Sequence, residues 1–183
     1  MIRHSFLFIL FSILVGTFSL SVHAETSNVH PQVQKILSQS EEPDGIVFDI
    51  ETLDSGALKS MAPFVTQQIE LIRKRYPDVD IAVVSHGAEE FALQKQAQPQ
   101  NADLHAMFNQ LVTDQSVSVH VCGAVGGLKN LTREDFPDFV SYSASGMAQL
   151  NDYKALGYQV VIIKQLSDKE RKALFGSPEK FVQ

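Results

Sequence analysis

The chain of 183 residues contains no tryptophan and a single cysteine, Cys122. A disulfide within one chain is therefore impossible, and a lone thiol in an oxidising compartment must be buried, bonded to another chain or used in chemistry. Positive charge is also scarce, because 15 lysines and arginines stand against 21 aspartates and glutamates. Such an acidic chain lacks the basic surface that binding to a phosphate backbone requires, so we expect no nucleic-acid partner.

Long hydrophobic runs are absent except at the N-terminus. Arg3 precedes an apolar run over residues 6–15, and Val22-His23-Ala24 offers small residues where a signal peptidase reads them. These features predict a signal peptide over residues 1–24, export to a periplasm and no membrane contact after cleavage. The alternative is an uncleaved membrane anchor, since residues 5–22 carry no charge and approach the length of a membrane span.

Five short segments rich in β-branched and aromatic residues alternate with helical patterns. The expected strands are residues 45–51, 80–86, 117–122, 139–143 and 159–164. Apolar residues recur every three or four positions from Leu58 to Ile72, and Pro77 ends this first expected helix. Further helices are expected over residues 89–111, with a break near Pro99, and over residues 145–156, before Gly157. This order predicts a single-domain, three-layer α/β sandwich with a mostly parallel five-stranded sheet.

The flanks of this domain, which we expect to cover residues 45–164, differ from it in composition. Residues 25–44 form a polar N-terminal segment that contains two prolines. Residues 165–183 form a tail with one short charged helix, SDKERKALF, which is more typical of a solvated or packing appendage than of a functional element.

Two residues with reactive side chains end strands of the expected sheet. His86 ends the second strand and Cys122 the third, at the edge where parallel sheets bind their ligands. Side chains alternate along a strand, so His120 lies on the same face as Cys122. A protonated imidazole near a thiol favours the reactive thiolate. We therefore take Cys122, His120 and His86 as candidate catalytic residues.

Glycines follow the cysteine directly, in the sequence CGAVGG. Gly123, Gly126 and Gly127 would let a substrate or a partner's thiol approach Cys122. Backbone N–H groups of such a loop also bind anions. We therefore take these three glycines as candidate ligand-binding residues.

Other interpretations of these motifs have less support. A lone cysteine on an apolar strand can be inert packing. His86, His120 and Cys122 could bind zinc or copper, but no paired-cysteine spacing supports it, so we expect no metal. Neither a phosphate-binding loop, a dinucleotide-binding turn nor a nucleophile elbow is present in the sequence. Asp49, Glu51 and Asp54 are expected to form a solvated loop that caps the first helix.

Three segments together resemble the DsrE/DsrF-like proteins. They are IAVVSHG at residues 81–87, VSVHVCG at residues 117–123 and FVSYSASGMAQLNDYKALGYQVVII at residues 139–163. The resemblance implies a five-stranded α/β sandwich that forms oligomers. It also implies a role in sulfur relay, with a persulfide on the strand-end cysteine, which corresponds to Cys122. This chain differs from the better-known relay members in its export signal and in the sequence after the cysteine.

Two functional hypotheses follow. The first is an exported DsrE-like protein that handles sulfane sulfur as a persulfide on Cys122, with assistance from His120 or His86. It would need no cofactor, would exchange sulfur with a donor or acceptor protein or a small sulfur species, and would form a homo-oligomer. The second is a non-catalytic module that binds a small ligand or a metal, or serves assembly, with a structural Cys122.

Overall fold

The computed structural model describes residues 28–181 and contains one five-stranded sheet, in the order β4-β3-β2-β1-β5. Every neighbouring pair of strands is parallel. The strands are β1 (Ile46–Ile50), β2 (Ile81–Ser85), β3 (Val117–Cys122), β4 (Ser141–Ser143) and β5 (Gln159–Lys164). The expected parallel sheet is therefore confirmed. The expected signal peptide, residues 1–24, lies outside the described residues.

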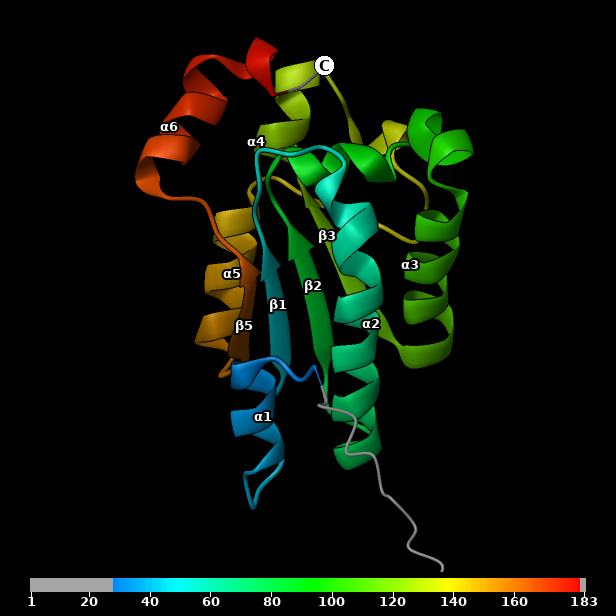
Figure 1. The fold of residues 1–183 in the computed structure, drawn as a ribbon, viewed down its shortest axis with the longest axis vertical. Helices are drawn as coiled ribbons and strands as arrows, with labels where there is room; N and C mark the ends of the chain where they lie inside the picture. The colour runs from blue at the N-terminus through cyan, green and yellow to red at the C-terminus, as the bar shows by residue number, and fades with distance from the viewer. Residues whose placement is uncertain (1–27, 182–183) are drawn as a thin grey trace, which may run out of the picture.

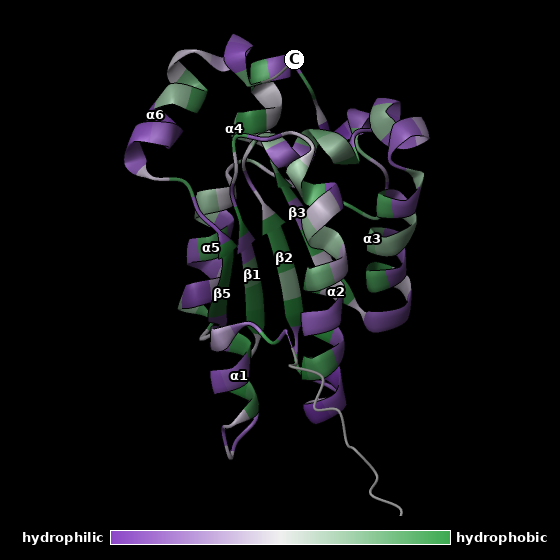
Figure 2. Cartoon of the chain, in the orientation of Figure 1, coloured by the Kyte–Doolittle hydropathy of each residue, from purple (hydrophilic) through white to green (hydrophobic). Residues whose placement is uncertain are grey.

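Helices cover both faces of this sheet, which makes the three layers of an α/β sandwich (Figure 1). One face carries α2 (Ala57–Arg75) and α3 (Ala102–Gln115), whose apolar stripes pack on the side chains of Phe48 and Val119. The other face carries α5 (Gly146–Ala155), whose Leu150 packs on Val47 and Val84. Figure 2 shows the apolar strands enclosed by helices with polar outer surfaces.

The N-terminal polar segment contains a helix that its composition did not predict, α1 (Pro31–Leu37). Proline begins this helix, where its missing N–H costs nothing, and the His30 side chain accepts the Gln32 N–H. Val33 and Ile36 are buried in the core shared with α2, so tertiary packing stabilises a helix too short to form alone.

The connections also differ from expectation. The second helical stretch is broken into two 3₁₀ segments, Ala88–Leu93 and Lys95–Gln100, before α3. The expected glycine loop after Cys122 is a helical turn, α4 (Gly123–Gly126), followed by the 3₁₀ turn Gly127–Lys129. The remaining elements are α6 (Asp168–Gly176) and the 3₁₀ turns Arg133–Asp135 and Pro178–Lys180.

The carboxyl ends of the strands meet beneath α4 and α6 (Figure 1). The alternation along β3 is confirmed, because Val117, Val119 and Val121 belong to the core under α2 and α3. His120 and Cys122 instead contact residues of α5. Within residues 28–181 the structure contains no helix long and apolar enough to cross a membrane.

Candidate functional site

Six ionisable side chains are buried where β1, β2 and β3 end. All are exposed by less than a tenth of their surface. They are Asp49, Glu51, His86, Glu89, Glu90 and Cys122. Burial of so many ionisable groups is costly unless they are paired or neutral, so the partners of each decide what the site can do.

Cys122 lies at the N-terminus of α5. Its Sγ accepts the backbone N–H of Gly146 at 3.2 Å, and the side chain is only 4% exposed. A β-carbon at position 146 would overlap the Cβ of His86 and lie 3.3 Å from the Cβ of Cys122, so only glycine allows this approach. The Gly146 contact therefore gives Sγ a backbone N–H donor at the start of a helix, where partial positive charge gathers.

Glu90 contacts the backbone of the same cysteine. Its Oε2 accepts the N–H of Cys122 at 2.8 Å, and the side chain is fully buried. Its Oε1 has no hydrogen-bond partner among the described residues. Burial raises the pKa of Glu90 well above its usual range, and the nearby Cys122 and Glu89 raise it further. Glu90 is therefore a buried acid that favours its neutral, proton-carrying form.

The adjacent Glu89 has a different environment. Its carboxylate accepts hydrogen bonds from four donors: the N–H groups of Thr52, His86 and Gly87 and the hydroxyl of Ser85. Burial raises the pKa of Glu89, and these hydrogen bonds act in the opposite direction. Because its donors come from the ends of both β1 and β2, Glu89 joins these two strand ends.

His86 lies between the carboxylates of Asp49, in β1, and Glu51, directly after β1. Its Nε2 is 2.7 Å from Asp49 Oδ1, and its Nδ1 is 3.6 Å from Glu51 Oε1. A carboxylate oxygen only accepts, so Nε2 donates to Asp49. Both ring nitrogens therefore face carboxylates at the end of β1, although the glycine at 146 brings His86 close to Cys122. This geometry does not form a cysteine–histidine–aspartate triad, in which a ring nitrogen must face the sulfur.

Glu51 binds Arg171 of α6 through both carboxylate oxygens, at 2.7 and 2.6 Å. The N–H of Leu166 also donates to this carboxylate. The expectation of a solvated loop was therefore wrong for Asp49 and Glu51, which are buried because His86 and Arg171 pair with them. Asp54 does lie before α2, where its side chain accepts the Gly56 N–H. The tail thus contributes a residue to the strand-end network.

His120 shares the face of Cys122 but has other partners. The Ser143 hydroxyl donates to Gln149, so its oxygen accepts from His120 Nδ1, at 3.2 Å. The Tyr153 hydroxyl lies 2.7 Å from Nε2 and donates to it. Burial lowers the pKa of His120. This environment favours a neutral imidazole, whereas the role expected from the sequence requires a charged one.

The three glycines after the cysteine have different surroundings. A β-carbon on Gly123 would lie 2.8 Å from the Tyr142 ring, whereas one on Gly127 would meet nothing within 4 Å. A β-carbon on Gly126 would lie 3.6 Å from Glu90 Oε1 and 3.4 Å from the Tyr142 hydroxyl. Gly126 therefore clears space beside the unpaired oxygen of Glu90, which the sequence did not reveal.

An apolar cap covers Cys122. The thiol belongs to a buried cluster with Ala88, Phe91, Val125, Leu166 and Leu174. Leu166 and Leu174 come from the segment after β5, so the C-terminal tail forms one side of this cluster. As for metals, residues 28–181 contain no group of three His, Cys, Asp or Glu side chains that could hold an ion. His86, His120 and Cys122 do not meet in that way.

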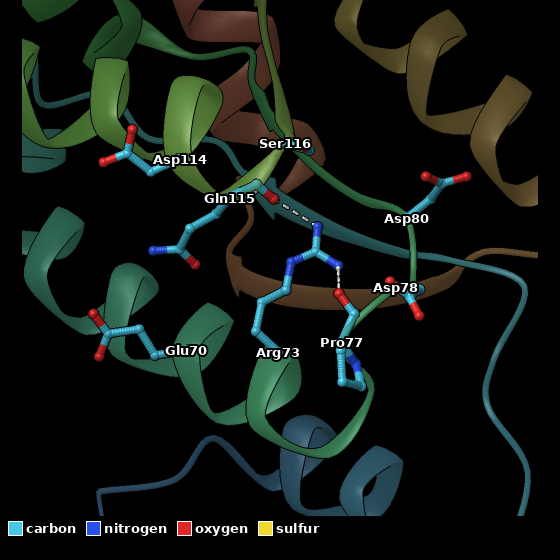
Figure 3. Close-up of a pocket in the computed structure, with 8 residues that line it drawn as sticks. All are labelled: Glu70, Arg73, Pro77, Asp78, Asp80, Asp114, Gln115 and Ser116. Atoms are coloured by element: carbon cyan, nitrogen blue, oxygen red, sulfur yellow. Dashed lines mark hydrogen bonds between the residues drawn. The ribbon is translucent and has the colours of Figure 1, made fainter.

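A more open cavity lies at the opposite edge of the sheet, where the strands begin (Figure 3). Its volume is about 530 Å³. It is lined by Glu70, Arg73, Pro77, Asp78, Asp80, Asp114, Gln115 and Ser116. Arg73 donates to the carbonyl oxygens of Pro77, Val79 and Gln115, and so joins the chain segments that precede β2 and β3. None of the candidate residues from the sequence lies there.

The fold is shared with a protein of known structure. That protein, MTH1491 from Methanobacterium thermoautotrophicum, is described as a protein of unknown function. The TM-score is 0.51 at 16% sequence identity, and the match covers 64% of this chain and 96% of the other. At this identity the likeness shows the fold alone. No family model matches the chain, and no curated protein matches it.

Proposed function

We propose that the protein carries sulfane sulfur as a persulfide on Cys122. The observation that carries this proposal is the contact between Cys122 Sγ and the N–H of Gly146 at the start of α5. A thiolate attacks sulfur and a thiol does not, and a helix N-terminus favours the thiolate. The resemblance to DsrE/DsrF-like proteins assigns the same role to the same residue. Export to a periplasm and assembly into homo-oligomers are part of the same proposal.

The chemistry needs no organic cofactor. The Cys122 thiolate attacks the outer sulfur of a donor R–S–SH, and a new S–S bond forms. The bond between that sulfur and R–S breaks, and R–S⁻ leaves with the electron pair. Cys122 sulfur is formally oxidised and the donor is reduced to a thiol. Delivery to an acceptor thiolate reverses these steps and releases the Cys122 thiolate.

Burial of the thiol restricts the donor. A side chain that is 4% exposed beneath an apolar cap is reached by a small species, or by a larger one after the cap moves. We therefore propose inorganic polysulfide or a small organic persulfide as the donor. A protein partner would have to displace α6 first.

The test is intact-protein mass spectrometry after brief exposure to polysulfide. We expect the native protein to gain the mass of one sulfur atom, the gain to disappear on reduction, and the Cys122→Ser variant to gain nothing. If the native protein gains nothing while the denatured protein does, the second candidate is correct. In that candidate Cys122 is a structural residue, and its burial in the apolar cluster is the observation that favours it.

A further inference from the structure

The Glu90 carboxyl group, in its neutral form, carries a proton that no described residue accepts. A neutral carboxylic acid donates through one oxygen and accepts through the other. Oε2 accepts the N–H of Cys122, so the acid proton belongs on Oε1. That oxygen is fully buried and has no hydrogen-bond partner within residues 28–181. A buried polar atom without a partner costs stability, which indicates that something outside the described structure engages it.

The surroundings of Oε1 place it beside the turn that follows Cys122. The missing side chain of Gly126 leaves space next to Oε1, and Gly126 lies in the turn that begins immediately after Cys122. The other wall of that space is Tyr142, whose hydroxyl donates to the Leu131 carbonyl at 3.0 Å. A group that enters this space therefore meets an acid oxygen on one side and the turn that follows Cys122 on the other.

Three other titratable groups lie around Glu90: Glu89, Cys122 and Tyr142. Glu89 already accepts four hydrogen bonds and faces the ends of β1 and β2. Burial raises the pKa of Tyr142, and the carboxyl of Glu90 raises it further, so Tyr142 keeps its proton. Glu90 is thus the group that is both proton-carrying and unpaired.

Resting on the function proposed above, we infer that Glu90 is the acid that protonates the sulfur leaving when Cys122 takes up sulfane sulfur. The reactive state has the negative charge on Cys122 and the proton on Glu90. Cys122–S⁻ attacks the outer sulfur of R–S–SH, the R–S bond to that sulfur breaks, and R–S⁻ takes the proton from Oε1. The products are Cys122–S–SH, R–SH and a Glu90 carboxylate.

The persulfide then restores the acid. Cys122–S–SH transfers its proton to the Glu90 carboxylate, which leaves Cys122–S–S⁻ beside a neutral Glu90. No proton or electron pair is lost in the sequence, so the same residue can protonate the Cys122 sulfur when it leaves during delivery to an acceptor. Glu90 therefore acts in both directions of sulfur transfer.

The test compares the wild-type protein with Glu90→Gln, which keeps an oxygen for the Cys122 N–H but cannot transfer a proton. We measure the rate of persulfide formation from polysulfide across pH, and the rate of alkylation by iodoacetamide as the control reaction. Alkylation needs the thiolate but no acid, because iodide leaves without a proton. We expect the variant to accept sulfur about 100-fold more slowly near neutral pH, with an alkylation rate within a few-fold of wild type.

The pH dependence of the persulfide rates distinguishes a catalytic acid at Glu90 from a residue with no role in the transfer. The wild-type to variant rate ratio should fall toward one as alkaline pH removes the Glu90 proton, and ionisation of the donor cancels in this ratio. A ratio of one at every pH, with both proteins accepting sulfur, overturns the role of Glu90 and leaves the proposed function standing. A wild-type protein that accepts no sulfur overturns both.

A measurement on the wild-type protein alone covers the case of a variant that does not fold. Its persulfide rate divided by its alkylation rate should decline at alkaline pH, again because only the first reaction needs the acid. Small aromatic persulfides, whose acidic thiols leave as thiolates without a proton, serve as the matched donor. A decline that is equally steep with this donor also overturns the role of Glu90.

Discussion

The two edges of the sheet carry similar numbers of acidic side chains in opposite environments. At the amino edge, Asp78, Asp80 and Asp114 line an open cavity of about 530 Å³ and are exposed to solvent (Figure 3). At the carboxyl edge, Asp49, Glu51, Glu89 and Glu90 are buried, and the last two lie in the 3₁₀ segment after β2. Exposed carboxylates keep their hydration, whereas buried ones lose it and require a partner or a proton.

This difference argues against choosing a site by cavity size. The amino edge offers room, but its arginine is engaged by backbone carbonyls and its carboxylates are solvated. The carboxyl edge has a smaller cavity, of about 340 Å³ beside Phe91. It also contains a thiol at a helix N-terminus and a buried acid, Glu90, whose pKa burial raises and whose Oε1 has no partner among the described residues. Perturbed groups next to a nucleophile are the better indication of chemistry.

The largest effect on the carboxyl edge is expected from Arg171→Ala. This change leaves the Glu51 carboxylate buried beside His86 without the partner that binds both its oxygens. We expect a loss of about 3 kcal/mol in the free energy of unfolding, measured by urea denaturation. Lys172→Ala is the matched control, since Lys172 is an exposed residue of the same helix, and it should change stability by less than about 0.5 kcal/mol.

The same variant tests whether α6 closes the site. If the Arg171–Glu51 pair holds the apolar cap over Cys122, iodoacetamide should label Cys122 faster in Arg171→Ala than in the Lys172→Ala control. Equal labelling rates in the two folded proteins would show that the pair does not control access to the thiol.

A somewhat smaller effect is expected from Gly146→Ala. The added methyl would overlap His86, so α5 must move away from the strand ends and the N–H contact to Cys122 Sγ must lengthen. We expect a loss of about 2 kcal/mol in unfolding free energy and slower alkylation of Cys122. Gly127→Ala is the control, because its β-carbon meets nothing within 4 Å and its φ of −60° suits any residue. Equal stability in the two variants would contradict the close packing inferred at residue 146.

The parallel sheet could be predicted from the sequence, whereas the buried acid Glu90 could not, and the reasons are physical. Apolar periodicity is a local property, so β3, β5 and the stripe of α2 could be located from neighbouring residues alone. The strand-end positions of His86 and Cys122 followed from the same pattern. The burial of Glu90 depends on β3, 32 residues away in sequence, and that of Glu51 on Arg171, 120 residues away. A glutamate in isolation indicates an exposed position, and nothing nearby in the sequence contradicts it.

The helix α1 was missed for a related reason. Its seven residues carry only two buried side chains, and the helix packs on both α2 and β5, which are distant in sequence from it. The Ser-Gly pair before α5 did carry a signal, since it belongs to the segment that resembles the DsrE/DsrF-like proteins. Its meaning, an N–H directed at the cysteine sulfur, required the three-dimensional arrangement.

The raised pKa of Glu90 predicts how stability changes with pH. Above the ordinary glutamate pKa, the unfolded chain has lost this proton while the folded protein retains it. The folded state then binds more protons, so the free energy of unfolding should decrease as the pH rises from about 4.5 toward the folded pKa. Glu90→Gln should show a shallower decrease and be the more stable protein at alkaline pH, as measured by urea denaturation across pH. An unchanged slope would mean that Glu90 is ionised in the folded protein.

The smallest expected effect on stability concerns His120. Its dependence on pH has the opposite sign to that of Glu90. Burial lowers the pKa of His120, so below about 6.5 the unfolded chain takes up a proton that the folded protein resists. The unfolded state then binds more protons, and stability should fall as the pH drops through this window. His120→Gln should weaken that fall, because glutamine does not titrate, while its amide can still bond Ser143 or Tyr153.

The same variant should accept sulfur on Cys122 at a rate within a few-fold of wild type, because both imidazole nitrogens are engaged away from the thiol. A large loss of sulfur uptake in the folded variant would restore His120 to the chemistry of the carboxyl edge.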